Sequence, residues 1–146
     1  MHLTIKSDYA LRTLIYLGSQ SDVTSMVTIK EIATTYNLPT SQIKRIAREL
    51  EVIGYLEIID GKKGYIKLAI PPSQITLGAV IKSTESLDLL ECFNHEQNQC
   101  IISPACQLKP ILSEALQAFL HVLEKYTLQD LVNNKTDLHS LFLIFK

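Results

Sequence analysis

Two short helical patterns joined by a tight turn place the strongest constraint on the fold of this chain. The run Thr28–Glu31 predicts a helix start, because the threonine hydroxyl and the glutamate carboxylate can each accept a hydrogen bond from an unpaired backbone amide. The run Asn37–Pro39 ends that helix, since asparagine tolerates a left-handed backbone and proline cannot continue a helix. A second helix, capped by Thr40 or Ser41, buries an apolar stripe made of Ile43, Ile46, Ala47, Leu50 and Ile53. This arrangement predicts a helix-turn-helix.

A further helix and a β-hairpin flank this motif. Ser7 is the expected N-cap of the first helix, whose apolar residues recur at helical spacing up to Gly18. After Gly54, the β-rich runs 55–59 and 65–68 enclose a glycine-bearing turn, which is typical of a hairpin. We therefore predict a mainly α fold with a small β-hairpin wing, in which residues 1–72 form a winged helix-turn-helix domain.

Cations on the second helix and on the hairpin indicate a DNA-binding surface. The formal net charge is −1, but residues 1–68 carry nine Lys or Arg against seven Asp or Glu. A helix of this kind enters the major groove, and a wing meets phosphates. The predicted DNA-binding residues are Thr40, Ser41, Gln42, Lys44, Arg45, Arg48, Lys62 and Lys63. The alternative is that the cations of the helix form an ordinary solvated face.

Apolar residues in the second half of the chain predict a homodimer. Ile75 and Thr76 start a helix that is expected to continue as far as Leu90 and to lead into a loop, so that residues 73–107 form a linking unit. In the unit 108–146, apolar residues repeat with coiled-coil spacing at Leu112, Leu116, Phe119, Leu123 and Tyr126. Pro110 must then lie in the first turn of this long dimerisation helix. We expect the apolar tail, residues 138–145, to dock on the body.

All the cysteines of the chain lie in one short stretch, at Cys92, Cys100 and Cys106. Polar residues and a Ser103-Pro104 break surround them, which is typical of a loop. Thiolates are soft ligands that suit iron-sulfur clusters and soft metals. Three cysteines leave one position for a ligand from elsewhere, and His95 in the same loop is one candidate.

Neither a signal sequence nor a membrane span is predicted. The N-terminal residues lack the basic and apolar pattern of a secretory signal, and no segment approaches the ~18 uninterrupted apolar residues of a transmembrane helix. We expect a cytoplasmic protein without a membrane partner. In that compartment a disulfide framework is not expected, so an odd number of cysteines indicates metal binding or redox chemistry.

The cysteines are also compatible with two other kinds of site. A zinc site could use the three cysteines and His95, but structural zinc sites favour Cys-x-x-Cys pairs and the chain has none. A thiol enzyme with Cys100 or Cys106 as nucleophile would need a base and an oxyanion site, yet the sequence has no glycine-rich elbow and no paired acid. We therefore predict that the chain is not an enzyme.

Several runs of the sequence match a known pattern nearly from end to end. They are Leu3-Thr4, Asp8–Arg12, Ile15-Tyr16, Gly54-Tyr55, Cys100–Lys109, Phe119-Leu120 and Tyr126–Val132. These runs resemble the NsrR/IscR family of iron-sulfur winged-helix regulators. Ser103–Cys106 favours the nitric-oxide-sensing NsrR branch over the IscR branch, which has a histidine shortly after the third cysteine. In the wing, Asp60-Gly61 replaces the Arg-Gly that is usual in the family.

The resemblance implies a homodimeric repressor that binds a palindromic operator in double-stranded DNA and senses nitric oxide. It implies that Cys92, Cys100 and Cys106 hold an iron-sulfur cluster, 4Fe-4S in preference to 2Fe-2S, and that Asp8 of the other subunit is the fourth ligand. Nitric oxide would release Asp8 and weaken operator binding. An acid at this position also has a role without metal, because it stabilises the helix dipole by ~0.3–1 kcal/mol. The alternative function is a redox- or iron-sulfur-status-sensing regulator of the same fold with a 2Fe-2S cluster.

Overall fold

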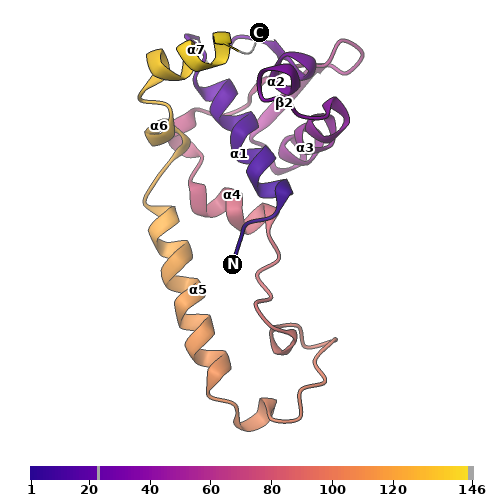
Figure 1. Cartoon of the computed structure of the whole chain (residues 1–146), viewed down its shortest axis with the longest axis vertical. Coiled ribbons are helices and arrows are strands. Elements are labelled where there is room, and N and C mark those ends of the chain that lie inside the picture. The colour runs from indigo at the N-terminus through magenta and orange to yellow at the C-terminus, as the bar shows by residue number, and fades with distance from the viewer. Residues whose placement is uncertain (23, 145–146) are drawn as a thin grey trace.

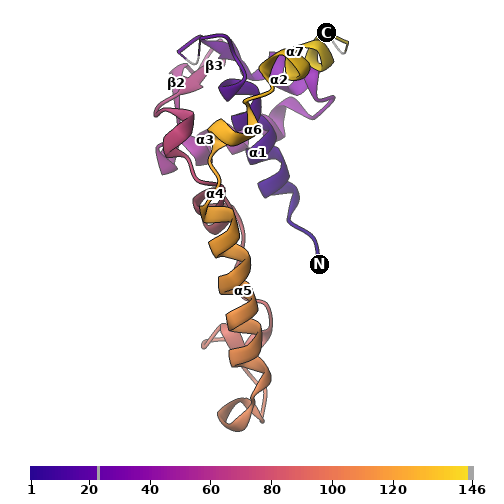
Figure 2. The same cartoon turned by 90° about the vertical axis from the view of Figure 1, so that its left-hand side faces the viewer.

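The computed structural model describes residues 1–22 and 24–144 and consists of a helical body with a small sheet, from which an arm extends (Figures 1 and 2). Helix α5 and the segment between α4 and α5 form the arm. The elements, in chain order, are α1 (Ile5–Gly18), β1 (Val27–Thr28), α2 (Ile29–Thr35), α3 (Thr40–Ile53), β2 (Leu56–Asp60), β3 (Tyr65–Leu68), the 3-10 turn η1 (Pro72–Gln74), α4 (Leu77–Thr84), the 3-10 turns η2 (Glu91–Phe93) and η3 (Ser103–Ala105), α5 (Leu108–Glu124), α6 (Leu128–Leu131) and α7 (Lys135–Ile144). The expected mainly α fold with a β-hairpin wing is confirmed.

Helix α1 begins earlier than predicted. The hydroxyl of Thr4 accepts a hydrogen bond from the backbone N–H of Ser7 at 3.4 Å, so the N-cap is Thr4 and the predicted cap at Ser7 is wrong. Threonine supplies the same capping oxygen as serine, three residues earlier along the chain. Ser7 is instead fully buried, and its hydroxyl lies 2.7 Å from that of Thr84 on α4.

The helix-turn-helix is confirmed, with one correction at its second helix. Thr28 caps α2 as predicted, because its hydroxyl accepts from the N–H of Glu31 at 3.0 Å, and Asn37 adopts the left-handed turn conformation with φ 52°. The expected cap of α3 by Thr40 or Ser41 is wrong: Pro39 is the N-cap, without a side-chain hydrogen bond. The carbonyl of Pro39 accepts from two N–H groups of the first turn, so both hydroxyls remain exposed to solvent.

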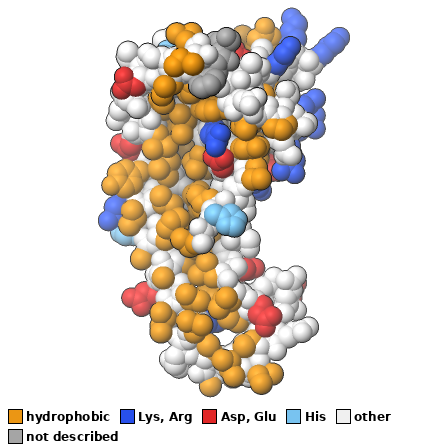
Figure 3. All heavy atoms as spheres, in the orientation of Figure 1, with side chains coloured by type: hydrophobic (Ala, Val, Ile, Leu, Met, Phe, Trp, Pro, Cys, Tyr) orange, Lys and Arg blue, Asp and Glu red, His pale blue; other side chains and the backbone are white. Residues whose placement is uncertain are grey.

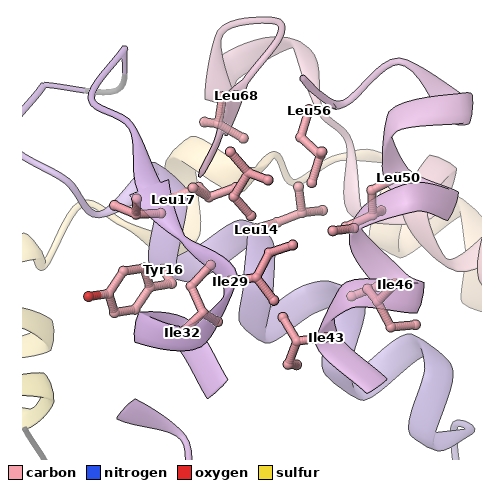
Figure 4. Close-up of a cluster of buried hydrophobic side chains, with 14 of the residues drawn as sticks. Leu14, Tyr16, Leu17, Ile29, Ile32, Ile43, Ile46, Leu50, Leu56 and Leu68 are labelled. Atoms are coloured by element: carbon pink, nitrogen blue, oxygen red, sulfur yellow. The ribbon is translucent and has the colours of Figure 1, made fainter. Parts of the chain in front are cut away.

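The core lies between α1, α2, α3 and the sheet (Figure 4). The predicted stripe of α3 is buried at Ile43, Ile46, Ala47 and Leu50, but Ile53 is 38 % exposed, contrary to the prediction. The chain leaves the helix at Gly54, whose left-handed φ of 95° turns it toward β2 and leaves Ile53 outside the core. Because the core fixes one face of α3, the opposite face points to solvent.

The wing is an antiparallel hairpin of β2 and β3, as predicted, and β1 pairs with the other edge of β3. The sequence did not indicate β1, since a strand of two residues has no readable alternation. The carboxylate of Asp60 accepts from the backbone N–H of Lys62 at 2.9 Å and of Lys63 at 3.2 Å, and Gly64 supplies a positive φ of 71°. Asp60 therefore shapes the turn that presents both lysines.

Helix α4 ends at Thr84, so the predicted continuation to Leu90 is wrong. The backbone of Glu85 is extended, with φ −105° and ψ 148°, and its side chain bonds to α1 instead. Helix α5 has Pro110 in its first turn, as expected. Of the apolar tail, Leu138 and Phe142 of α7 pack against the core, whereas Phe145 lies outside the described residues.

A close approach between α4 and α5 fixes the base of the arm. A methyl group at Gly78 would lie 2.5 Å from Cγ of Glu124 and 3.0 Å from its backbone nitrogen. We expect Gly78→Ala to lower the free energy of unfolding by about 1–3 kcal/mol, because the backbone of α5 must move. Urea denaturation measures this loss. Gly61→Ala, where the added methyl meets open space, is the control, and equal midpoints for both variants would contradict the prediction.

Candidate nucleic-acid interface and metal-binding loop

The solvent face of α3 carries free cations. Lys44, Arg45 and Arg48 are exposed, and within residues 1–22 and 24–144 none of them forms an ion pair. Thr40 and Ser41, at the start of the same helix, are also exposed. Further predicted residues include Gln42, which is partly buried, and the two exposed wing lysines, Lys62 and Lys63. In Figure 3, Lys and Arg side chains gather on the side of the body where α3 and the wing lie. The face is chemically suited to a polyanion.

Other cations near this face form ion pairs with carboxylates of the same chain. Lys6 of α1 pairs with Glu49 of α3 at 2.8 Å, and Lys67 pairs with Glu57 across the hairpin at 3.5 Å. The first pair is one of the contacts between α1 and α3, which also pack together in the apolar core. Lys6 and Lys67 are not among the predicted DNA-binding residues, and each has a carboxylate partner in its own chain.

The cysteine loop, residues 85–107, contains the short 3-10 turns η2 and η3 as its regular structure. The amide of Asn98 organises it: its oxygen accepts from the N–H of Cys100 at 3.1 Å, and its nitrogen lies 2.9 Å from the hydroxyl of Ser103. Cys92 is only 7 % exposed, while Cys100 and Cys106 are partly buried. All of these cysteines are free thiols.

Among the described residues, no group of three His, Cys, Asp or Glu side chains lies close enough to hold a metal ion. A single chain in this conformation therefore does not bring Cys92, Cys100 and Cys106 together, and neither His95 nor Asp8 completes a site. His95 is exposed to solvent in the loop. The donor chemistry nevertheless fits an iron-sulfur cluster, since three free thiols lie on one segment whose hydrogen bonds are mostly local.

Asp8 lies on α1, in the body, and its carboxylate is held by Arg12. The guanidinium of Arg12 contacts both carboxylate oxygens, each at 2.8 Å, and the two side chains are 43 % and 41 % exposed. Arg12 also lies 5.8 Å from the centre of the ring of Tyr36, the C-cap residue of α2. Because exposed pairs of this spacing contribute only about 0.3–0.5 kcal/mol, the carboxylate of Asp8 is accessible to another partner.

Glu85 makes contacts with the start of α1 that the sequence did not predict. One oxygen of its carboxylate accepts hydrogen bonds from the N–H of Thr4, from the hydroxyl of Thr4 and from the hydroxyl of Ser7. Burial raises the pKa of Glu85. The hydrogen bonds from Ser7 and Thr4 and the charge of His2 together lower this pKa by more than burial raises it, so it lies below its ordinary value. No local signal could have shown this contact, because Thr4 and Glu85 are 81 positions apart.

Among the described residues, no helix is both long and apolar enough to cross a bilayer.

Comparisons with known proteins place the chain in a family. Residues 3–134 match Rrf2, described as an iron-dependent transcriptional regulator. The chain is similar to the HTH-type transcriptional regulator NsrR of Halalkalibacterium halodurans, with 46 % identity over 97 % of both chains, and to that of Bacillus subtilis, with 43 % identity over 97 % of both chains. Its fold is similar to that of Staphylococcus aureus CymR, with a TM-score of 0.71 and 23 % identity over 89 % of this chain and 97 % of that one. The chain therefore belongs to the Rrf2 family of iron-dependent transcriptional regulators, and it is a DNA-binding regulator rather than an enzyme.

Proposed function

We propose that this chain is a homodimeric repressor of a palindromic operator and that it senses nitric oxide through an iron-sulfur cluster. Cys92, Cys100 and Cys106 of one subunit and Asp8 of the partner subunit would hold the cluster. The observation that carries the proposal is a set of three free cysteines on one loop in a chain 43–46 % identical to proteins named NsrR. A cluster of the 4Fe-4S type is favoured over 2Fe-2S by the resemblance to that branch.

The apolar surface of α5 supports the homodimer. Ile111 is 61 % exposed, Val122 51 % and Phe119 36 %. Figure 3 shows hydrophobic side chains along α5 and at the tip of the arm. Leu120 is buried against its own chain and the seam residues Leu112, Leu116 and Leu123 are partly buried, so the apolar surface left for another subunit is formed by Ile111, Phe119 and Val122. Symmetric packing of two α5 helices would place two α3 helices in one dimer, one for each half-site of a palindromic operator.

The cysteines and Asp8 have distinct roles in this proposal. When bound, the cluster supplies iron with which nitric oxide can react. The three thiolates are strong, soft ligands, whereas the carboxylate of Asp8 is a hard oxygen donor and the more exchangeable ligand. Asp8 belongs to α1, which contacts α3 through the Lys6–Glu49 pair. Release of Asp8 from the cluster would therefore change the support that α1 gives to α3, the DNA-reading helix. Operator affinity would fall as a result.

The test is a visible and EPR spectrum of anaerobically purified protein, recorded with operator affinity before and after addition of nitric oxide. A brown protein whose absorbance changes and whose affinity falls at least about tenfold supports the proposal. A colourless protein that contains zinc would contradict it. If nitric oxide leaves the cluster unchanged but the redox state of the cluster alters DNA affinity, the alternative function, a redox-sensing regulator with a 2Fe-2S cluster, would be favoured.

Substitutions on α3 and on the wing should weaken DNA binding in different ways. Arg45→Ala or Arg48→Ala is expected to cost about 1–3 kcal/mol of operator affinity if the arginine reads a base edge. Lys62→Ala and Lys63→Ala should mainly reduce the salt dependence, because phosphate contacts release counterions. Fluorescence anisotropy at several salt concentrations measures both effects. Unchanged affinity and salt slope in all four variants would remove this face from the interface.

Replacing Asp8 tests the proposed fourth ligand. Asp8→Ala should keep a cluster on the three cysteines but change its visible circular dichroism and weaken operator binding without nitric oxide. The matched control is Asp137→Ala, which removes another first-turn acid, on α7. If both variants merely lose the ~0.3–1 kcal/mol of a helix-dipole interaction and retain the wild-type spectrum, Asp8 is not a ligand.

A further inference from the structure

Glu85 joins the start of the cysteine loop to the first turn of α1. It is the first residue after α4. Its Oε1 accepts from the N–H of Thr4 at 2.6 Å, from the hydroxyl of Thr4 at 2.9 Å and from the hydroxyl of Ser7. Ser7 is fully buried and also contacts Thr84, the last residue of α4. Hydrogen bonds to a carboxylate are charge-assisted and therefore stronger than those to a neutral acceptor.

The partners of Glu85 are the residues that determine how α1 begins. Thr4 is the N-cap of α1, and Ser7 immediately precedes Asp8. Two residues C-terminal to Thr4, Lys6 forms the ion pair with Glu49 of α3. A displacement of Glu85 would therefore remove the acceptor shared by Thr4 and Ser7 and loosen the turn that carries Asp8 and supports α3.

We propose that Glu85 is a positioning residue that couples the cysteine loop to the DNA-reading helix within one subunit. The proposal rests on the proposed function, because it gives the loop a route to α3 that does not cross the subunit interface. It differs from a ligand role: the carboxylate contacts α1 donors, and Glu85 belongs to no group of potential metal ligands among the described residues. Coupling of this kind requires that the loop and α1 loosen together.

The first experiment uses hydrogen exchange on cluster-free, full-length protein. In Glu85→Ala, we expect faster exchange in residues 4–8 and in the loop base, 85–92, by about tenfold, as one lost hydrogen bond to a charged group produces. Glu85→Gln retains an oxygen acceptor and should give a smaller change. Asp88→Ala, an exposed acid of the same loop, should leave both segments unchanged. Faster exchange in only one segment, or in neither, would overturn the proposal.

The second experiment compares operator affinities of the cluster-loaded and cluster-free forms. Glu85→Ala should keep the visible absorbance of the cluster but reduce the ratio of the two affinities at least about threefold relative to wild type. A residue with a merely structural role would weaken both forms equally and leave the ratio unchanged, which would contradict coupling. If wild-type protein takes up no cluster, the proposed function fails, whereas the exchange result still decides whether Glu85 couples the two segments.

Discussion

Replacing any one of Cys92, Cys100 or Cys106 by alanine is expected to abolish binding of the iron-sulfur cluster while the protein stays folded. Two remaining thiolates do not complete the ligand set of a cluster. Cys100 and Cys106 contribute little to the core, so their variants should lie within ~0.5 kcal/mol of wild type in the free energy of unfolding. Visible absorbance after reconstitution and a thermal melt followed by far-ultraviolet circular dichroism measure the two quantities.

The buried position of Cys92 gives its variant an additional, smaller effect. Its side chain is 7 % exposed, so Cys92→Ala should also lose about 1 kcal/mol of stability from the removed sulfur contact. His95→Ala is the control for the alternative ligand in this loop, and we expect it to retain full absorbance. Full absorbance in any of the cysteine variants would contradict the proposed ligand set. Loss of absorbance in His95→Ala would identify His95 as a cluster ligand.

Local patterns in the sequence were sufficient to predict the helix-turn-helix and the wing, although they gave the wrong cap for α3 and placed the exposed Ile53 in the core. The cap at Thr28, the left-handed Asn37 and the apolar stripe of α3 all lie within one or two helical turns. The hairpin turn at Asp60–Gly64 is equally local. Each of these features forms from neighbouring residues, so the order of residue types is enough to predict it.

Other features that the sequence did not reveal depend on residues far apart in the chain. Strand β1 exists because Val27 pairs with Ile66, and α4 ends at Thr84 while Glu85 bonds to α1. The assignment of Ser7 as a cap was wrong because its hydroxyl meets α4 instead. The proposed cluster site is harder still, since its fourth ligand is assigned to a second subunit and no pattern in one chain indicates that pairing.

A charge placed on the apolar face of α5 should have the largest effect on DNA binding. Phe119→Glu is expected to convert the proposed dimer into a monomer, because an ionised carboxylate cannot be buried in an apolar interface without a partner. Phe119 is 36 % exposed in the single chain, so the monomer itself should remain folded. Sedimentation velocity measures the oligomeric state, and a thermal melt confirms that the chain folds.

Operator affinity should fall together with the dimer. Each monomer would bind one half-site without the linkage that makes the second contact intramolecular, so we expect a loss of about 10²–10⁴-fold. Gln117→Glu is the matched control, because it adds the same charge at an exposed polar position of α5. A Phe119→Glu variant that sediments as a dimer and binds the operator like Gln117→Glu would show that α5 does not form the interface. Subunit contact would then have to involve another surface, and that surface would have to bring Asp8 to the partner subunit's cysteine loop.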